Sequence, residues 1–334
     1  MIAQLDGNLI RSRPWRAITR LVSYSLFEGR PLTTRGRWIN PAVFGFLKTL
    51  KHIPVIDHGP APLFIIGTGR SGTTVLGQIL GLHRQVGFLN EPKAMWHVIN
   101  QEEDIVGNYT EVPARYRLEA EDANSRMIED AQRLYGWYKY FGLCSLVVDK
   151  YPELVFRISY VLRLFPGARF IFLVRNGWDT CFSIDNWSDQ HAQHEALETH
   201  DWWGRNRRKW LYLVEQVASS DEQLSDYVEE LHTLKDHRLM AAVEWVLSMS
   251  EGLKHMVEYP ENIQMVRYED LVNDPVSTLQ TLFSFARLSE DRKVVAYASE
   301  ILRTTGKRPA FPMPDHLRSR FDAVMSQLGY VGDI

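Results

Sequence analysis

The sequence predicts an α/β fold, a three-layer sandwich in which helices cover both faces of a central, mostly parallel sheet. Short apolar runs recur along the chain, and each is followed by a segment whose apolar residues have helical spacing. Strands that alternate with helices in this way form parallel sheets. No linker of Pro, Gly or Ser divides the chain, and 45% of its 334 residues are apolar. We therefore expect residues 1–334 to form one domain.

The strands are the clearest elements. Residues 63–66 form a continuous apolar run that ends at Gly67, and residues 146–148 and 263–266 are similar short runs. The longest run, residues 169–174, follows a Phe-Pro-Gly break at residues 165–167. Apolar runs of this length without alternation are typical of strands that are buried on both faces.

Helices are predicted where apolar residues return every three or four positions. The first occupies residues 73–82, directly after the Gly-rich turn that follows the first strand. Further helices are expected at about residues 153–164, from about 178, and at about 276–286, 291–302 and 315–328. Residues 102–140 are polar, aromatic and irregular, so no regular element is predicted there.

Two segments lie outside this alternating pattern. Residues 190–260 read as a helical insertion. Residues 1–60 form a basic N-terminal segment, since residues 1–51 contain nine Arg and Lys against only Asp6 and Glu28. This segment could contact an anionic membrane surface peripherally or pack against acidic groups of its own fold.

Composition narrows the class of protein. No apolar run reaches the roughly 18 residues of a membrane span, and residues 1–13 lack the apolar core of a secretory signal. Cys144 and Cys181 are too few for a disulfide framework, so a reducing cytoplasm is expected. A net charge of −3 argues against nucleic acid as the partner. The oligomeric state is not indicated.

The strongest functional signal is the turn between the first strand and the first helix, residues 67–74, Gly-Thr-Gly-Arg-Ser-Gly-Thr-Thr. Glycines allow the backbone to turn sharply and to approach a ligand, and the amides at a helix start form an anion site. Hydroxyls from Ser71, Thr73 and Thr74 and the guanidinium of Arg70 add donors. The turn therefore predicts a phosphate site in a sandwich of P-loop type.

This turn differs from the loop that binds ATP or GTP. Gly67 and Gly72 have the spacing G-x-x-x-x-G, but Thr73 stands where the nucleotide-binding lysine belongs. Asp149 is the nearest candidate for holding magnesium, and it is not convincing. We expect a phosphate-like ligand that needs no metal.

The motif Gly69-Arg70-Ser71-Gly72-Thr73-Thr74 resembles the 5′-phosphosulfate loop of sulfotransferases that use 3′-phosphoadenosine-5′-phosphosulfate (PAPS). It is closest to the arginine variant of bacterial, carbohydrate and tyrosylprotein sulfotransferases. Family members bind the 3′-phosphate with an arginine at a strand end and a serine eight residues later, which here are Arg175 and Ser183. The resemblance covers about residues 62–330 and implies PAPS as the donor, with adenosine 3′,5′-bisphosphate as the product.

The resemblance also implies catalytic residues. Residues 88–92, Phe-Leu-Asn-Glu-Pro, stand where these enzymes place a catalytic glutamate, which makes Glu91 the candidate base. Residues 149–152, Asp-Lys-Tyr-Pro, match a segment whose lysine contacts the transferred group, here Lys150. Arg70 and Lys150 would stabilise charge on the leaving group of an in-line displacement. The box at residues 267–271, Arg-Tyr-Glu-Asp-Leu, is expected to be structural.

Alternatives to these assignments stay open. Glu91 could instead cap a helix or pair with Arg70, and Lys150 could pair with Asp149 or Glu153. The chain lacks the histidine motif of the cytosolic branch. In place of that branch's arginine-lysine-glycine box it has residues 304–309, which makes Lys307 a candidate for the 3′-phosphate. A P-loop kinase of small metabolites and an inactive PAPS-binding scaffold are the competing functions.

The acceptor is the least specified part of the site, and we place the helical insertion at residues 190–260 on its side. A hydroxyl or amine of a glycan, a glycolipid, a tyrosine or a natural product would suit the site. Four tryptophans could form one wall of an acceptor site, although core packing is expected for most of them, namely Trp187, Trp202, Trp203 and Trp210. The spacing of His191, His194, His200 and Asp201 fits no zinc pattern, so no metal is predicted.

Overall fold

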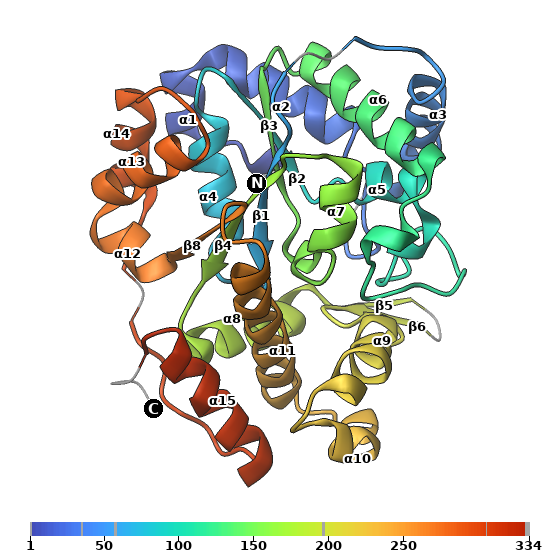
Figure 1. Cartoon of the computed structure of the whole chain (residues 1–334), viewed down its shortest axis with the longest axis vertical. Coiled ribbons are helices and arrows are strands. Elements are labelled where there is room, and N and C mark those ends of the chain that lie inside the picture. The colour runs from blue at the N-terminus through green and yellow to red at the C-terminus, as the bar shows by residue number, and fades with distance from the viewer. Residues whose placement is uncertain (1, 35, 57–58, 196–197, 305, 331–334) are drawn as a thin grey trace.

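The computed structural model of the protein describes residues 2–34, 36–56, 59–195, 198–304 and 306–330. A five-stranded parallel sheet with the order β2-β3-β1-β4-β8 lies at its centre (Figure 1). The strands are β1 (Leu63–Gly67), β2 (Val86–Asn90), β3 (Leu146–Lys150), β4 (Arg169–Val174) and β8 (Ile263–Arg267). The predicted α/β fold with a parallel sheet is confirmed.

Helices cover both faces of the sheet because alternate strand residues point to opposite sides. Phe64 and Ile66 belong to one apolar cluster, and Leu63 and Ile65 belong to the other. The first cluster includes residues of α3 (Asn40–Leu50), α5 (Lys93–Ile99), α6 (Ser125–Phe141), α7 (Ile158–Leu164), α8 (Gly177–His191), α11 (His237–Glu258) and α15 (Asp315–Gln327). The second includes residues of α1 (Gly7–Ser12), α2 (Pro14–Leu26), α4 (Thr73–Gly81), α12 (Tyr268–Asn273), α13 (Pro275–Phe285) and α14 (Arg292–Ile301).

The strand order creates a place for a ligand. Strands β1 and β4 are neighbours at the centre of the sheet. The chain continues from β1 toward β2 at one edge and from β4 toward β8 at the other, so the two connections depart in opposite directions. In open parallel sheets, ligands bind beyond the carboxyl ends of the strands at such a switch point. The turn at residues 67–74, Lys150 and Arg175 all lie at or just past these carboxyl ends.

Several elements were not predicted, among them strand β2 and helix α6. Strand β2 contains Gly87 and is short, and it is recognisable only from its packing, since Phe88 fits against Gly77 and Gly81 of α4. The prediction that residues 102–140 are irregular is wrong for α6. Its buried face mixes the covered rings of Tyr135 and Tyr138 with the polar Asp130 and Lys139, and this composition obscured the helical period.

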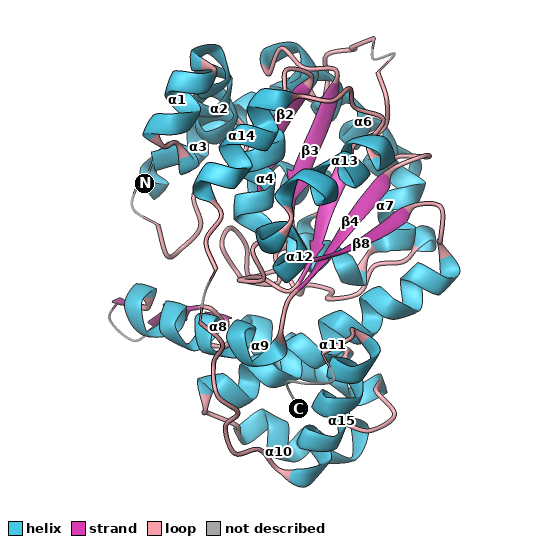
Figure 2. Cartoon of the chain, turned by 90° about the vertical axis from the view of Figure 1, so that its left-hand side faces the viewer, coloured by secondary structure: helices cyan, strands magenta, loops and turns pink. Residues whose placement is uncertain are grey.

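The insertion at residues 190–260 is only partly helical. It begins with a small antiparallel sheet of β5 (Gln193–Glu195), β6 (Glu198–Asp201) and β7 (Gly204–Arg205). Helices α9 (Arg208–Gln216), α10 (Val228–Thr233) and α11 follow, and Figure 2 shows them below the main sheet together with α8 and α15. Helix α11 is also a core element, because Gly252 lies directly against the ring of Phe172 in β4.

The basic N-terminal segment packs on the body of the protein. Arg16, Arg20 and Arg30 are buried, and Arg20 pairs with Glu28 of the same segment. Arg13 forms an ion pair with Asp291 (2.6 Å). Arg13 and Arg20 therefore pair with acidic groups of the fold, as the second alternative for this segment predicted, while Arg16 and Arg30 donate to backbone carbonyl oxygens. Within the described residues, no helix has both the length and the apolar character that spanning a bilayer requires.

Candidate functional site

The turn at residues 67–74 has a backbone that only glycine can adopt at two positions. Gly67 has a φ of +137°, and a Cβ there would lie 2.5 Å from the carbonyl oxygen of Leu173. Gly72, with a φ of +95°, precedes α4, and a Cβ there would lie 2.3 Å from the ring of Tyr268. No side chain caps α4, so the backbone amides at its start have no side-chain acceptor.

The same turn holds polar atoms that lack partners. The hydroxyls of Thr68 and Ser71 are buried, and neither has a hydrogen-bond partner among the described residues. Buried hydroxyls without partners are costly, so a ligand that accepts hydrogen bonds would satisfy them. Together with the helix start, they lie where the sequence predicted an anion site.

A hollow of about 290 Å³ joins this turn to the end of β4. Its lining includes six of the predicted donor-site residues: Arg70, Gly72, Thr73, Thr74, Arg175 and Ser183. The Nε of Arg70 donates to the hydroxyl of Ser183 (3.3 Å), and Nη1 of Arg175 donates to the carbonyl oxygen of Arg70 (3.2 Å). The structure therefore brings the two separated parts of the predicted site together. We call this space the donor hollow.

Tyr268 is a residue of this site that the sequence did not identify. Its ring packs against Gly72 and lies 4.7 Å below the guanidinium of Arg175. The neighbouring Glu269 accepts from the backbone amide of Asn176 (3.0 Å), the residue after Arg175. The box at residues 267–271, expected to be structural, thus supports both Arg175 and the turn at residues 67–74, which we call the phosphate turn.

Lys307 is exposed and lies outside the lining of the donor hollow as the described residues define it. The next residue, Arg308, donates its amide to Asp179 (2.8 Å), and Asp179 lies 3.8 Å from Nη2 of Arg175. The segment with Lys307 therefore reaches the partner of Arg175, while the role of Lys307 itself stays a prediction.

A second hollow, of about 460 Å³, meets the first. Both are lined by Arg70, Thr73 and Thr74, and the second also contains Glu91 and Lys150. We call it the acceptor hollow. A group bound at the phosphate turn is accessible from both sides, and Arg70 stands at the junction.

Glu91 pairs with two lysines. Its carboxylate forms an ion pair with Lys150 and lies 3.3 Å from the ammonium of Lys93. Burial alone would raise the pKa of Glu91, but the two ammonium groups outweigh it and hold this pKa well below its usual range. Glu91 is therefore ionised. Among the described residues its partners are lysines, so the alternative that it pairs with Arg70 is wrong.

The charges continue into the insertion. Glu153 lies 3.8 Å from Lys93 and 3.6 Å from Lys209, and burial, which would raise its pKa, is outweighed by these cations so that the pKa is lowered. Lys209 in turn pairs with Glu244 (2.5 Å). No sequence pattern predicts this network, because its members come from four segments far apart in the chain. The alternatives that Lys150 pairs with Asp149 or Glu153 are wrong.

Asp149 is turned away from the site. It is fully buried and accepts hydrogen bonds from Trp96 (2.9 Å) and Tyr135. Burial raises its pKa to about 7 despite these donors. Its position in the core, on the face of the sheet that carries α5 and α6, is unsuited to holding magnesium at the phosphate turn.

The four tryptophans divide evenly between wall and core. Trp187 and Trp202 line the acceptor hollow and make an edge-to-face contact with ring centroids 5.4 Å apart. Trp202 also packs against Gly69, donates to Glu244 (2.6 Å) and carries Lys209 over its ring. Trp203 and Trp210 are fully buried.

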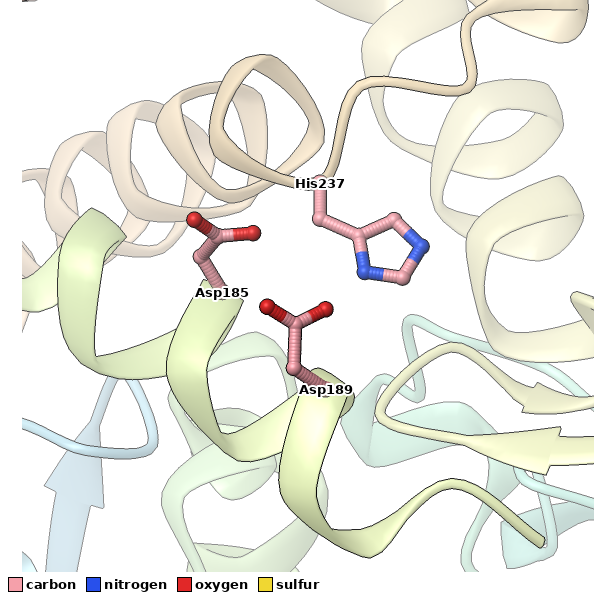
Figure 3. A group of neighbouring side chains, drawn as sticks. All are labelled: Asp185, Asp189 and His237. Carbon is pink, nitrogen blue, oxygen red and sulfur yellow. The ribbon is translucent and has the colours of Figure 1, made fainter.

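The predicted absence of a metal rested on His191, His194, His200 and Asp201. His200 and Asp201 line the acceptor hollow, and the side chain of His194 lies outside the described residues. In the described part of the chain, one other group could hold an ion: Asp185 and Asp189 on α8 with His237 at the start of α11 (Figure 3). Asp185 already pairs with Arg238 (2.6 Å), and nothing further at this group points to a ligand.

Comparison with known families gives one match that covers most of the chain. The model described as "Sulfotransferase family" matches residues 62–292. That range contains the phosphate turn, Glu91, Lys150, Arg175 and Ser183. It leaves out the N-terminal segment and Lys307.

Two curated relatives are distantly similar. An uncharacterised protein of Aquifex aeolicus is 23% identical over 240 residues, which are 71% of this chain and 26% of that protein. A protein-tyrosine sulfotransferase of Drosophila melanogaster is 23% identical over 234 residues, covering 64% of this chain and 41% of the relative. This chain thus spans less than half the length of either relative.

Solved structures give weaker likenesses. The sulfotransferase domain from the curacin biosynthetic pathway has a TM-score of 0.49 at 17% identity, over 80% of this chain and 97% of that domain. The sulfotransferase STF9 from Mycobacterium avium has a TM-score of 0.44 at 14% identity, over 96% of this chain and 86% of that protein. Scores at this level say nothing about the site residues or the acceptor.

Proposed function

The chain belongs to the sulfotransferase family, and we propose that it transfers a sulfuryl group from PAPS to an acceptor hydroxyl or amine by in-line displacement. The observation that carries this proposal is the meeting of the two hollows at Arg70, Thr73 and Thr74. One hollow has the cationic, amide-rich chemistry for a bisphosphorylated donor. The other has a carboxylate and aromatic walls for an acceptor.

The donor residues fit PAPS by their chemistry. The amides at the start of α4 and the unpartnered hydroxyl of Ser71 are suited to the 5′-phosphosulfate. Arg175 and Ser183 line the other part of the donor hollow and would hold the 3′-phosphate. Arg70 is close to both, because its side chain bonds Ser183 while its carbonyl oxygen accepts from Arg175.

Charge stabilisation is the main contribution that these residues would make. The donor supplies an activated sulfuryl group, whose bond to the 5′-phosphate breaks as the bond from the acceptor to sulfur forms. Arg70, Lys150 and the amides of the turn would stabilise negative charge on the leaving phosphate, as in phosphoryl transfer. Because Lys150 is almost fully buried, its attraction to that charge is only weakly screened by water.

Glu91 would accept the proton of the acceptor. Its pKa lies well below its usual range, so the carboxylate is a weak base but is ionised at every working pH. It can accept a hydrogen bond from a bound hydroxyl and take the proton as the hydroxyl oxygen bonds to sulfur and becomes more acidic. Its side chain is 34% exposed, within reach of a ligand in the acceptor hollow.

For the acceptor, we propose a hydroxylated molecule such as a glycan, glycolipid or natural product. The hollow combines aromatic faces from Trp187 and Trp202 with many charged groups, which suits sugar rings better than a purely apolar molecule. A tyrosine hydroxyl is the acceptor class that the Drosophila relative's name suggests. A location in the cytoplasm remains part of the proposal.

The test is turnover without magnesium. The purified protein is incubated with PAPS and a panel of sugars, glycolipids, tyrosyl peptides and amines, and the release of adenosine 3′,5′-bisphosphate is measured. Release that depends on one acceptor class supports the proposal and identifies that class. Binding without turnover for every acceptor favours the scaffold, and phosphoryl transfer from Mg-ATP favours the kinase.

A further inference from the structure

The N-terminal segment, which precedes the family match at residue 62, reaches into the site. Residues 28–34 and Tyr24 line the acceptor hollow beside Glu91 and Lys93. Gly29, with a φ of +71°, lies so close to the start of α5 that a Cβ there would be 2.6 Å from the Cβ of Ala94. This segment therefore packs directly on the residues that follow Glu91.

Glu91 has a backbone conformation that needs support. Its φ is +50°, a left-handed value that is unfavourable for a residue with a side chain. Such conformations persist where the surroundings fix them. On the side of the sheet, the amide of Glu91 donates to the carbonyl oxygen of Lys150 (2.7 Å), in line with the pairing of Asn90 and Lys150 between β2 and β3.

On the other side, Glu28 accepts hydrogen bonds from two backbone amides that flank Glu91. Its carboxylate oxygen Oε1 accepts from the amide of Asn90 (2.8 Å), and its carbonyl oxygen accepts from the amide of Ala94 (3.3 Å). One residue of the N-terminal segment thus contacts the chain just before and just after the strained position.

The Glu28 carboxylate is itself fixed by Arg20. Both side chains are buried, and Nη2 of Arg20 donates to Oε2 of Glu28 (2.9 Å) while Nη1 pairs with Oε1. Arg20 also lies over the ring of Phe88, two residues before Asn90. A buried carboxylate that is held by a forked guanidinium has little freedom to rotate.

We propose that Glu28 is a positioning residue for the Glu91 carboxylate, which makes the N-terminal segment an integral part of the acceptor site. This inference rests on the proposed function, in which Glu91 faces the acceptor. Without the Glu28 contact, the backbone at Asn90–Glu91 relaxes and the carboxylate leaves its place between Lys150 and Lys93. Glu28 lines the acceptor hollow but is absent from the lining of the donor hollow among the described residues, so donor binding should be unaffected by its loss.

The experiment compares Glu28→Asp and Glu28→Ala with a matched control. Glu28→Asp keeps the charge opposite Arg20 but withdraws the carboxylate from Asn90 by one methylene. We therefore expect Glu28→Asp to fold even if Glu28→Ala does not. Asp291→Ala is the control, because it removes another largely buried ion pair that ties the N-terminal segment, through Arg13, to the body. Asp291 lines neither hollow among the described residues.

Both Glu28 variants are expected to lower kcat by on the order of 10- to 100-fold, as small misplacements of a catalytic group do. Their affinity for adenosine 3′,5′-bisphosphate should match that of the wild type. Asp291→Ala should lower the melting temperature and leave kcat within about twofold. If the Glu28 variants behave like Asp291→Ala, with reduced stability and unchanged kcat, the proposal is overturned.

A second readout does not depend on turnover. The side-chain carboxyl carbon of Glu91, assigned with Glu91→Gln, is titrated by 13C NMR in the wild type and in Glu28→Asp. A rise in the pKa of Glu91 in the variant, as the carboxylate leaves the two lysines, supports positioning by Glu28. An unchanged titration overturns it, even if the protein proves to be no sulfotransferase, so the two failures can be told apart.

Discussion

The ammonium of Lys150 and the carboxylate of Glu91 form an ion pair across the carboxyl ends of the neighbouring strands β3 and β2. This contact joins two residues that lie 59 positions apart in the sequence. It fixes the charge state of the proposed base and keeps the lysine in the lining of the acceptor hollow. The proposed chemistry therefore depends on the register of the sheet as much as on the motifs.

Replacing Glu91 tests its role directly. Glu91→Gln keeps the shape of the side chain but removes the proton acceptor, so kcat should fall by on the order of 10² to 10⁴ while the affinity for adenosine 3′,5′-bisphosphate is unchanged. Steady-state kinetics and calorimetry measure the two effects. Glu258→Gln, at the far end of α11, serves as the control with normal turnover. Full activity in Glu91→Gln would show that the proton goes elsewhere.

Changing Gly72 tests the phosphate turn. In Gly72→Ala the new methyl group meets the Tyr268 ring at a position with positive φ, and strain of about 1–3 kcal/mol is expected. Donor affinity should fall about tenfold or more. Gly45→Ala is the matched control, since a Cβ there has no neighbour within 4 Å and lies in α3. Gly45→Ala should bind the donor normally, and equal donor affinity in both variants would contradict this account of the turn.

Asp149 should make stability depend on pH. Burial raises the pKa of Asp149 from 3.8, the ordinary value of a free side chain, to about 7. Because the folded value is the higher one, its contribution to stability is complete below about pH 4, declines as pH rises toward 7, and then levels off. Asp149→Asn keeps acceptors for Trp96 and Tyr135 without the proton release.

The measurement for Asp149 is the free energy of unfolding of both proteins in denaturant between pH 5 and pH 8. The free energy of unfolding of Asp149→Asn minus that of the wild type should increase as pH rises from 5 to 7, by up to about 1.4 kcal/mol per pH unit. Above pH 7 this difference should be constant. A difference that does not vary with pH would mean that Asp149 is ionised throughout.

The sequence predicted the parts of the site that depend on short spacing. Arg70, Thr73 and Thr74 lie in one strand-turn-helix unit, and Arg175 and Ser183 lie in another, so local rules place each set. The strand order then brings the two units together at the carboxyl ends of β1 and β4. Helix α6 and strand β2 were not predicted, because tertiary packing rather than an aliphatic period defines them.

The partners of the site residues could not be predicted in the same way. Lys93, Glu153 and Lys209 are surrounded by ordinary sequence, and only the fold brings their charges within 4 Å. Glu28 is equally remote from Glu91 in sequence, and Tyr268 belonged to a segment that looked structural. Long-range pairs of this kind leave no periodic pattern in a single sequence.

The most direct test of the central claim is a calorimetric titration of the protein with adenosine 3′,5′-bisphosphate in the absence of magnesium. A separate titration with Mg-ATP gives the comparison. Arg175→Ala removes a charged donor from the donor hollow, and Arg169→Ala, at the opposite end of the same strand, is the control. We predict that the bisphosphate binds to the wild type and to Arg169→Ala, and about 10- to 100-fold more weakly to Arg175→Ala. No binding of the bisphosphate, or a preference for Mg-ATP, would contradict the assignment of a PAPS site.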